Sequence, residues 1–357
     1  MRALTVQAGV GGSVAWSDID EPDPNEGEVL IATHRVGLCG TDREIAAGEY
    51  GQAPGGDEGA GQGQLVLGHE ALGRVLEAPQ GAMVSAGDLV VPVVRHPDPV
   101  PCTQCAAGEW DMCGNGLFTE HGIAGRHGFP RERFRTSPGM LVRVPESLED
   151  LGVLVEPATV GAKAWEHIEW IAQRSRSSLH RVLVTGTGPI GLLVTLMAVQ
   201  RGYEVHVLGR ATSGLKPDLV AALGAQYHTG GATDLGCNVD VAVECTGACS
   251  VIEEVLGVVA RNGIVCLTGL SAPAPAGVDL GTLGRDMVLK NLVVFGSVNA
   301  NRRHFEAAGA ALTAADSCWL AQLVTTRVPA YGSLPEAGSA ATVLERGAHD
   351  VKTVLQF

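Results

Sequence analysis

Hydrophobic residues follow two different patterns along the chain. Up to about residue 155, short valine-rich runs such as 28–32 and 88–94 alternate with Gly- and Pro-rich segments, which predicts a β-rich domain. Beyond about residue 160, apolar runs alternate with helical segments, which predicts a doubly wound α/β unit on a parallel sheet. Its expected strands are 181–184, 205–208, 239–244 and 264–267. Residues 296–357 mix helix and strand, and we expect them to complete the first domain.

A glycine-rich turn follows the first strand of the α/β unit. It reads Gly-Thr-Gly-Pro-Ile-Gly and leads directly into the apolar segment 192–199. Strand, tight turn and helix in this order are what a dinucleotide pyrophosphate requires, because the helix N-terminus presents free N–H groups to the anion. A purely structural turn is the alternative, and the flanking elements disfavour it. We expect the phosphates to lie against Gly186, Thr187, Gly188, Pro189, Ile190 and Gly191.

The end of the second strand indicates which dinucleotide is preferred. Sites that prefer NAD usually place a carboxylate there to bond the ribose 2′-hydroxyl. Here the strand ends in Gly209 and Arg210, which leave room for a 2′-phosphate and offer it a guanidinium. Ser213 and Lys216 lie close enough in the sequence to contribute. We therefore expect NADP as the cofactor, with NAD as the second possibility.

Composition narrows the function classes. The chain has 357 residues, 45% of them hydrophobic, which is ample for two buried cores. Its net charge of −14 disfavours binding to nucleic acid or to an anionic membrane. The start lacks a basic, apolar leader, and no apolar run reaches the roughly 20 residues of a membrane span. We expect a cytoplasmic protein, in which clustered cysteines indicate metal binding before disulfides.

Metal-ligand side chains lie on glycine turns of the first domain. Cys39 occurs in Leu-Cys-Gly-Thr-Asp, and His69 and Glu70 occur in Leu-Gly-His-Glu-Ala-Leu-Gly. Glu156 lies just before the α/β unit. A thiolate, an imidazole and carboxylates suit zinc, and a catalytic zinc needs only three protein ligands beside an open position.

The order of these motifs resembles the zinc-dependent medium-chain dehydrogenase/reductase superfamily over essentially the whole chain. Segments 119–129, 207–210 and 296–308, with Arg95, resemble the archaeal-type glucose 1-dehydrogenase subfamily. The resemblance implies a GroES-like catalytic domain at 1–158 and 296–357. It also implies a Rossmann NADP-binding domain at 159–295.

Roles for individual residues follow from the same resemblance. Cys39, His69 and Glu156 would bind the catalytic zinc, with Glu70 as a direct or exchanging fourth ligand, and Thr41 would bond the reacting hydroxyl. The expected sugar contacts are Thr41, Arg95, Glu120, Glu156 and Asn299. The expected cofactor contacts beyond the glycine turn are Gly209, Arg210, Ser213, Thr246, Gly247, Thr268, Leu270, Ser297 and Asn299.

The family's structural zinc lobe is incomplete here. Its four cysteines usually follow C-x2-C-x2-C-x7-C, and this chain has the last three as Cys102, Cys105 and Cys113, with Pro99 in the first position. Asp98 or His96 is a candidate for the fourth ligand. The alternative is a lobe without metal, held by packing alone. The other cysteines, 237, 245, 249, 266 and 318, we expect to be buried, inert thiols.

The implied reaction is hydride transfer from a sugar carbon to NADP, assisted by zinc, which turns an aldose such as glucose into a lactone at C1. One alternative is a dehydrogenase of another polyol, cyclitol or modified sugar, whose substrate the Gly-rich loop 51–63 would help to select. Another is a non-catalytic protein that senses NADP. We expect a homodimer or homotetramer, with the apolar strand near 291–295 as an edge partner.

Overall fold

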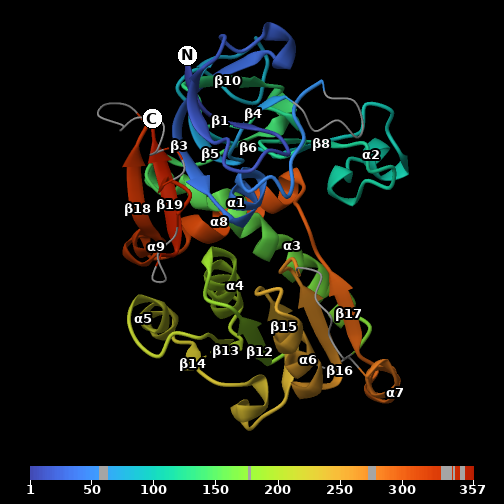
Figure 1. Cartoon of the computed structure of the whole chain (residues 1–357). Helices are drawn as coiled ribbons and strands as arrows, with labels where there is room; N and C mark the ends of the chain where they lie inside the picture. The colour runs from blue at the N-terminus through green and yellow to red at the C-terminus, as the bar shows by residue number, and fades with distance from the viewer. Residues whose placement is uncertain (56–62, 176–177, 272–278, 331–339, 341, 346–349) are drawn as a thin grey trace. The chain divides into compact units, whose positions relative to one another are not determined.

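The computed structural model describes residues 1–55, 63–175, 178–271, 279–330, 340, 342–345 and 350–357. Most of the Gly-rich loop expected over the substrate, residues 56–62, lies outside these ranges. The described chain forms two compact units. One comprises residues 1–156 and 300–357, and the other comprises residues 157–299. Figure 1 shows the elements of both.

The first unit is built mainly from antiparallel strands. Among the described residues its largest sheet has the order β11-β6-β5-β3-β19-β18, with β10 also paired to β3. The strands of this unit are β1 Arg2–Gln7, β2 Ala15–Asp18, β3 Val29–Leu38, β4 Gln64–Val66, β5 Glu70–Glu77, β6 Leu89–Pro92, β7 Arg95–His96, β8 Thr119–His121, β9 Gly125–Arg126, β10 Arg133–Thr136, β11 Leu141–Arg143, β18 Val324–Pro329 and β19 Lys352–Gln356.

The C-terminal strand completes this sheet. Strand β19 pairs antiparallel with β3 through Thr353–Leu38 and Gln356–Arg35, so a strand from the first 40 residues and the last strand of the chain lie side by side in one sheet (Figure 1). Strand β3 is longer than the predicted run 28–32 because it also continues against β5. The helices of this unit are α1 Gly40–Ala46, α2 Thr103–Ala106, α8 Arg302–Thr313 and α9 Ser317–Leu323, and α3, Val155–Ala172, begins in it.

The second unit has a parallel sheet. Its six described strands have the order β14-β13-β12-β15-β16-β17, and every pairing is parallel. The bounds are β12 Arg181–Thr185, β13 Glu204–Leu208, β14 Gln226–His228, β15 Val239–Glu244, β16 Val259–Leu267 and β17 Val293–Gly296. The helices are α4 Pro189–Gln200, α5 Leu215–Ala222, α6 Cys249–Val258 and α7 Leu280–Lys290, in addition to most of α3. This strand order is that of a Rossmann fold, so the predicted fold class is confirmed.

The sheet of the second unit is buried on both faces. Leu183, Ala242 and Val265 lie in one apolar cluster with Val255 of α6, which explains why these strands read as nearly continuous apolar runs. None of the helices in the described ranges is long and apolar enough to span a bilayer.

The prediction that the scattered cysteines are buried is wrong for Cys318, which is exposed. Helix α9 buries Trp319, Leu320 and Leu323 against the unit, so Cys318 lies on its opposite face. Cys237, Cys245 and Cys249 are half-buried, and Cys266 is buried. All nine cysteines lie in the described residues, and none forms a disulfide.

Candidate functional site

Strand pairing brings three expected zinc ligands together. Cys39 follows β3, and Glu70 opens β5 opposite Gly37 of β3. Potential ligand atoms of Cys39, His69 and Glu70 all lie within 4.8 Å of one another, and Cys39 Sγ is 3.4 Å from His69 Nε2. A Cβ at position 37 would meet the Glu70 carboxylate at 2.1 Å, so only glycine leaves room for it. The chain thus forms a compact donor set of sulfur, nitrogen and oxygen.

Glu156, at the start of α3, is the remaining expected ligand, and it is not part of this group of three. It is close enough to interact electrostatically with His69, Glu70 and Lys352, and burial raises its pKa. Burial also raises the pKa of Cys39. Burial alone would lower the pKa of His69, but the charges of Cys39 and Asp42 raise it well above its ordinary value. Together these groups create a negative environment that favours a cation.

Asp42 positions the ligands, and no role was expected for it beyond its place in the Leu-Cys-Gly-Thr-Asp motif. Its fully buried carboxylate accepts the Cys39 N–H at 2.8 Å and the Gly68 N–H at 3.1 Å. The same carboxylate lies 3.7 Å from His69 Nδ1. Asp42 therefore fixes the two segments that carry Cys39 and His69. Its position three residues after Cys39, at the third residue of α1, was the available sequence signal.

Lys352 is the second residue that sequence reasoning missed. Its ammonium lies 2.6 Å from each carboxylate oxygen of Glu70 and also donates to the Leu38 carbonyl at 3.4 Å. Both charged side chains are at most 3% exposed. A lysine beside the apolar residues Val351, Val354 and Leu355 near the end of the chain was the only hint in the sequence. Because Lys352 holds Glu70, the arrangement favours Glu70 as an exchanging ligand rather than a permanent one.

The expected sugar-binding residues Arg95 and Glu120 form a buried ion pair. They are register partners on β7 and β8, with Arg95 Nε 3.0 Å from Glu120 Oε1. The guanidinium also lies over the Phe118 ring, 3.6 Å from its centroid. Burial and the nearby Glu120 charge raise the pKa of Tyr50, which is half exposed beside this pair. Thr41, on α1, is partly exposed within the Cys39 segment.

The three cysteines of the lobe also come together. Ligand atoms of Cys102, Cys105 and Cys113 lie within 4.8 Å of one another, with no fourth His, Asp or Glu in the group among the described residues. Asp98 uses both carboxylate oxygens on Val100 N–H and the Asn115 amide. His96 instead contacts His121, with their Nε2 atoms 3.0 Å apart. Neither candidate therefore supplies the fourth ligand in this structure.

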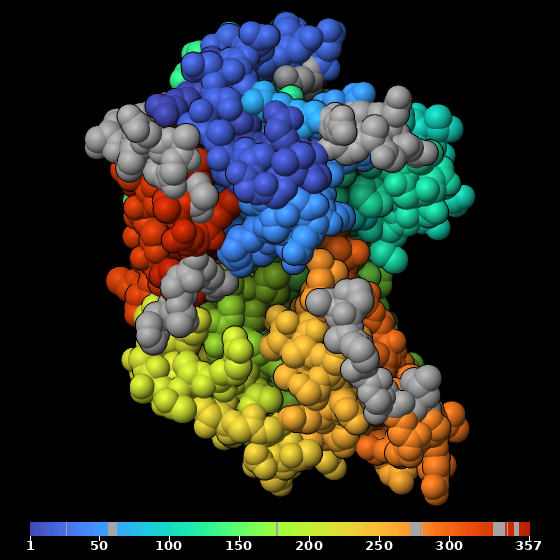
Figure 2. Space-filling model, in the orientation of Figure 1, coloured from blue at the N-terminus to red at the C-terminus, as the bar shows by residue number. Residues whose placement is uncertain are grey.

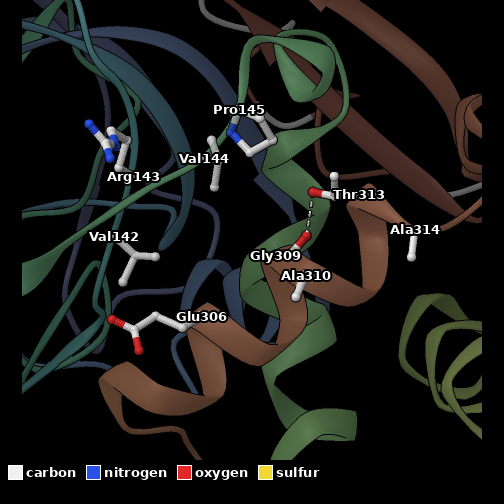
Figure 3. Close-up of a pocket in the computed structure, with 9 residues that line it drawn as sticks. All are labelled: Val142, Arg143, Val144, Pro145, Glu306, Gly309, Ala310, Thr313 and Ala314. Carbon is white, nitrogen blue, oxygen red and sulfur yellow. Dashed lines mark hydrogen bonds between the residues drawn. The ribbon is translucent and has the colours of Figure 1, made fainter.

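A surface hollow lies elsewhere in the first unit. It has a volume of about 440 Å³ and is bounded by the end of β11 and one side of α8 (Figure 3). Its lining residues are Val142, Arg143, Val144, Pro145, Glu306, Gly309, Ala310, Thr313 and Ala314. None of the expected catalytic, cofactor or sugar contacts belongs to it, so it is not the catalytic site.

The glycine-rich turn has the geometry of a pyrophosphate site. Gly186 has φ +92°, which favours glycine, and its N–H donates to the Leu208 carbonyl at 2.8 Å. A Cβ on Gly191 would meet the Gly186 oxygen at 2.0 Å, so glycine lets α4 start against the turn. A Cβ on Gly188, the residue before α4, would meet no protein atom within 4 Å, which leaves this backbone open to a ligand. Thr187 and Ile190 are partly exposed beside it.

Arg210 is available for a phosphate. It is exposed directly after β13, and it forms no ion pair or hydrogen bond with the residues that the structure describes. Ser213 is also exposed, in the loop that leads to α5. Figure 2 shows this yellow-green part of the chain at the surface of the second unit. No carboxylate occupies the position at which an NAD site usually has one.

The other expected cofactor loops lie against one another at the carboxyl ends of β15 and β16. A Cβ on Gly247 would meet the Leu270 carbonyl oxygen at 2.2 Å, so the two loops are in direct contact. The Thr268 N–H donates to the Glu244 carbonyl at 2.8 Å. The Glu244 side chain, which sequence reasoning left without a role, accepts bonds from the hydroxyl of Thr185 and from the backbone of Gly247. Through this side chain and its backbone carbonyl, Glu244 joins the ends of β12, β15 and β16.

The segment after β17 carries the remaining residues that are expected to contact the cofactor and the sugar, Ser297 and Asn299. Asn299 adopts a left-handed conformation with φ +59°, and the buried Lys163 donates to the carbonyl of Val298 at 3.0 Å. Ser297 bonds through its N–H to the Leu267 carbonyl at 2.9 Å. The Ser297 hydroxyl is buried and has no hydrogen-bond partner among the described residues.

Known proteins match both halves of the chain. Residues 25–146 match the family described as alcohol dehydrogenase GroES-like domain, and residues 149–357 match glucose dehydrogenase C-terminus. Glucose 1-dehydrogenase 2 of Vulcanisaeta moutnovskia is 38% identical over 363 residues, covering 100% of this chain and 99% of that protein. Glucose 1-dehydrogenase of Thermoproteus tenax is 40% identical over 335 residues, covering 92% and 93%.

A solved structure agrees with these sequence matches. Glucose dehydrogenase of Haloferax mediterranei, in complex with NADP, Zn and gluconolactone, superposes with a TM-score of 0.87 at 31% identity. The match covers 100% of this chain and 99% of the other. With the motif order, the fold and the grouped ligands, these matches show that the chain belongs to the zinc-dependent medium-chain dehydrogenase/reductase family, in its glucose 1-dehydrogenase group.

Proposed function

We propose that this protein oxidises an aldose, most directly glucose, at C1 to the lactone, with zinc and NADP as cofactors. The observation that carries the proposal is the donor set of Cys39, His69 and Glu70, beside Glu156, in a chain similar to a dehydrogenase solved with NADP, Zn and gluconolactone. The expected roles of the individual residues remain part of this proposal.

The residues at the first site fit zinc. In a tetrahedral site, bond lengths of about 2.3 Å to sulfur and 2.0 Å to nitrogen place the two ligand atoms about 3.5 Å apart. Cys39 Sγ and His69 Nε2 are 3.4 Å apart. The carboxylates of Asp42, Glu70 and Glu156 carry three negative charges when ionised, against the single ammonium of Lys352, which contacts Glu70. A dication would offset this excess of negative charge.

The second unit fits NADP. The open backbone at Gly188, the start of α4 and the exposed Arg210 match a pyrophosphate followed by a 2′-phosphate. The buried Ser297 hydroxyl, without a partner in the described chain, adds a donor that a bound cofactor could use.

When bound, zinc would supply a Lewis acid that makes the substrate hydroxyl easier to deprotonate, and NADP would supply the hydride acceptor. The chain's own contribution is positioning. Cys39, His69 and Glu156 would hold the metal, and Asp42 keeps the first two in place. Lys352 orients the Glu70 carboxylate. Thr41 would accept or donate a hydrogen bond at the reacting hydroxyl.

Sugar recognition follows from the buried pair of Arg95 and Glu120. A site whose polar groups pair with several hydroxyls rejects simple alcohols, because those alcohols leave the polar groups unpaired. The same reasoning admits a cyclitol or modified sugar, which remains the second candidate. Asn299, held in its left-handed conformation, is the proposed contact from the second unit.

We also propose self-association and a cytoplasmic location. Strand β17 is the outer strand of the described parallel sheet, and an open edge of this kind pairs readily with another copy. Nine unpaired cysteines suit a reducing compartment. The three-thiol lobe is proposed as a second zinc site, in which three thiolates would leave one position for an external ligand.

The test is a substrate panel. Zinc-loaded protein is incubated with NADP and aldoses, polyols, cyclitols or simple alcohols, while NADPH absorbance and lactone formation are followed. Turnover of glucose or a close aldose with lactone as product supports the proposal. Activity confined to a cyclitol or modified sugar would refute the glucose assignment, and silence on every compound would favour an NADP-sensing protein.

A further inference from the structure

Tyr227 connects two segments of the expected cofactor site. It lies in β14, at the outer edge of the sheet beside β13, where Val207 is its register partner. Its hydroxyl donates to the Ala211 carbonyl at 2.7 Å. The side chain of Thr187 is close enough to interact electrostatically with the same phenol. The phenol therefore lies beside the pyrophosphate turn while it bonds to the residue that follows Arg210.

The ring of Tyr227 also packs on the backbone just before Arg210. A Cβ at Gly209 would lie 2.5 Å from the Tyr227 oxygen and 3.0 Å from each of two ring carbons. These distances are shorter than Cβ contacts in folded proteins. Glycine at position 209 therefore leaves room for this ring, in addition to the room that it leaves for a 2′-phosphate.

The loop that carries Arg210 has little other support. Gly209 N–H donates to the His228 carbonyl at 3.0 Å, which fixes the end of β13. Between Arg210 and Ser213, the bond from Tyr227 to Ala211 is the only hydrogen bond to any residue that the structure describes. The pyrophosphate turn, in contrast, is held independently by the bond from Gly186 to Leu208 and by its contact with Gly191. Loss of the phenol would therefore affect the loop more than the turn.

We propose that Tyr227 is a positioning residue for cofactor specificity, which holds the loop of Arg210 where its guanidinium meets the 2′-phosphate of NADP. This inference rests on the proposed use of NADP. A charged side chain on an untethered loop must be ordered when the phosphate binds, and the entropy lost in that step weakens binding. With Tyr227 in place, that ordering has already occurred in the free protein.

The test is nucleotide binding by the full-length Tyr227→Phe variant. Phenylalanine keeps the ring on Gly209 and removes only the hydroxyl. Dissociation constants are measured by calorimetry for NADPH, NADH, 2′,5′-ADP and 5′-AMP. We expect NADPH and 2′,5′-ADP to bind about 3- to 10-fold more weakly, as for the loss of one neutral hydrogen bond. NADH and 5′-AMP, which lack the 2′-phosphate, should change less than about twofold on the same reasoning.

Tyr203→Phe is the matched control. Tyr203 lies before β13, packs on Trp165 with ring centroids 5.4 Å apart, and touches neither segment of the cofactor site. Its variant should bind all four nucleotides like the natural protein. If Tyr227→Phe weakened NADH as much as NADPH, Tyr227 would merely support the fold, and the specificity role would be refuted. Unchanged binding of all four nucleotides would refute it as well.

Gly209→Ala remains testable by itself should Tyr227→Phe fail to fold, because the added Cβ displaces the same ring. Alone, it should weaken the binding of NADPH and 2′,5′-ADP. Where Tyr227→Phe folds, the two substitutions are also combined. In a double-mutant cycle, the alanine should weaken NADPH binding less in the Tyr227→Phe background, where the closest clashing atom is gone. Equal effects in both backgrounds would contradict the proposed contact. If the natural protein bound NADH but not NADPH, the proposed cofactor itself would fail, which the calorimetry shows before any variant is compared.

Discussion

Lys352 and Glu70 form a buried ion pair although 282 residues separate them in the sequence. The pair joins the C-terminal strand β19 to the beginning of β5, next to Cys39 and His69. Lys352 thus orients a carboxylate that lies within 4.8 Å of the ligand atoms of Cys39 and His69. The orientation of a candidate zinc ligand thus depends on the last strand of the chain.

Lys352→Met should destabilise the first unit. It leaves the Glu70 carboxylate buried without its cation, at a cost of about 3–5 kcal/mol in the free energy of unfolding. Urea unfolding measures this cost. The double variant Lys352→Met/Glu70→Gln should be more stable than Lys352→Met alone, because the uncompensated charge is gone. A double variant that is even less stable would show that the two side chains do not depend on each other.

Asp42→Asn should weaken zinc binding. The amide retains the size of the side chain but turns an N–H₂ group toward one of the two backbone donors, Cys39 N–H or Gly68 N–H, and it removes the charge near His69. Changes in residues that orient metal ligands typically cost about 10–100-fold in affinity. Competition with a chromophoric chelator measures the effect. Asp88→Asn, a change at a surface turn, is the control. Equal zinc affinity of Asp42→Asn and the natural protein would exclude this role.

The strands of the second unit and the type of site could be predicted from the sequence, because both are encoded locally. The run 239–244 coincides with β15, and the Gly-rich turn lies between β12 and α4 as its spacing required. Lys352 could not be predicted, because its partner depends on β19 pairing with β3. The pairing of Arg95 with Glu120 likewise depends on the register of β7 and β8.

The exposure of Cys318 shows a second limit of structure prediction from the sequence. A cysteine on a short helix is buried or exposed according to the face that the tertiary structure covers, and the seven residues of α9 do not define that face alone. Tyr227 shows the same limit within the cofactor site. Its contact with Gly209 arises from the neighbouring positions of β13 and β14 in the sheet.

Unfolding should become easier below neutral pH because of His96 and His121. Burial lowers the pKa of His96 to about 3 and that of His121 well below its ordinary value. His121 Nδ1 lies 2.8 Å from the His127 carbonyl and must donate to it, so its Nε2 accepts from His96. A proton added to His121 would remove the acceptor of this bond, and burial disfavours a charge on either ring. Both rings are therefore neutral in the folded protein.

The unfolded chain takes up protons at these histidines as the pH falls through about 6.5, and the folded chain does not. The stabilisation is therefore complete above this pH and declines below it, by about 2 kcal/mol for each histidine at pH 5. Urea unfolding at pH 7.5 and pH 5 measures the decline. His96→Gln should reduce it, whereas His180→Gln, at an exposed histidine, should not. Identical pH dependence in the natural protein and His96→Gln would contradict the neutral pair.

Glu244→Gln should loosen the cofactor loops. The carboxylate accepts the Thr185 hydroxyl at 3.1 Å, the Thr246 N–H at 2.6 Å and the Gly247 N–H at 3.0 Å. A glutamine amide places a donor against one of these donors, which costs about 1–3 kcal/mol in the free energy of unfolding. The affinity for NADPH should fall together with the stability, because the loosened loops belong to the expected cofactor site. Glu253→Gln, on the exposed side of α6, is the matched control, and a Glu244→Gln variant that behaved like this control would refute the role.

The most direct test of the proposed reaction is the initial rate of NADPH formation from glucose by the zinc-loaded protein, measured beside the Cys39→Ala variant. We expect the natural protein to reduce NADP, to release the lactone and to prefer NADP to NAD. The Cys39→Ala variant should bind NADPH normally but lose at least about 100-fold in rate, because the Lewis acid is removed. Equal rates for the two proteins would contradict the zinc site, and the absence of any reduction with glucose and other aldoses would contradict the proposed function.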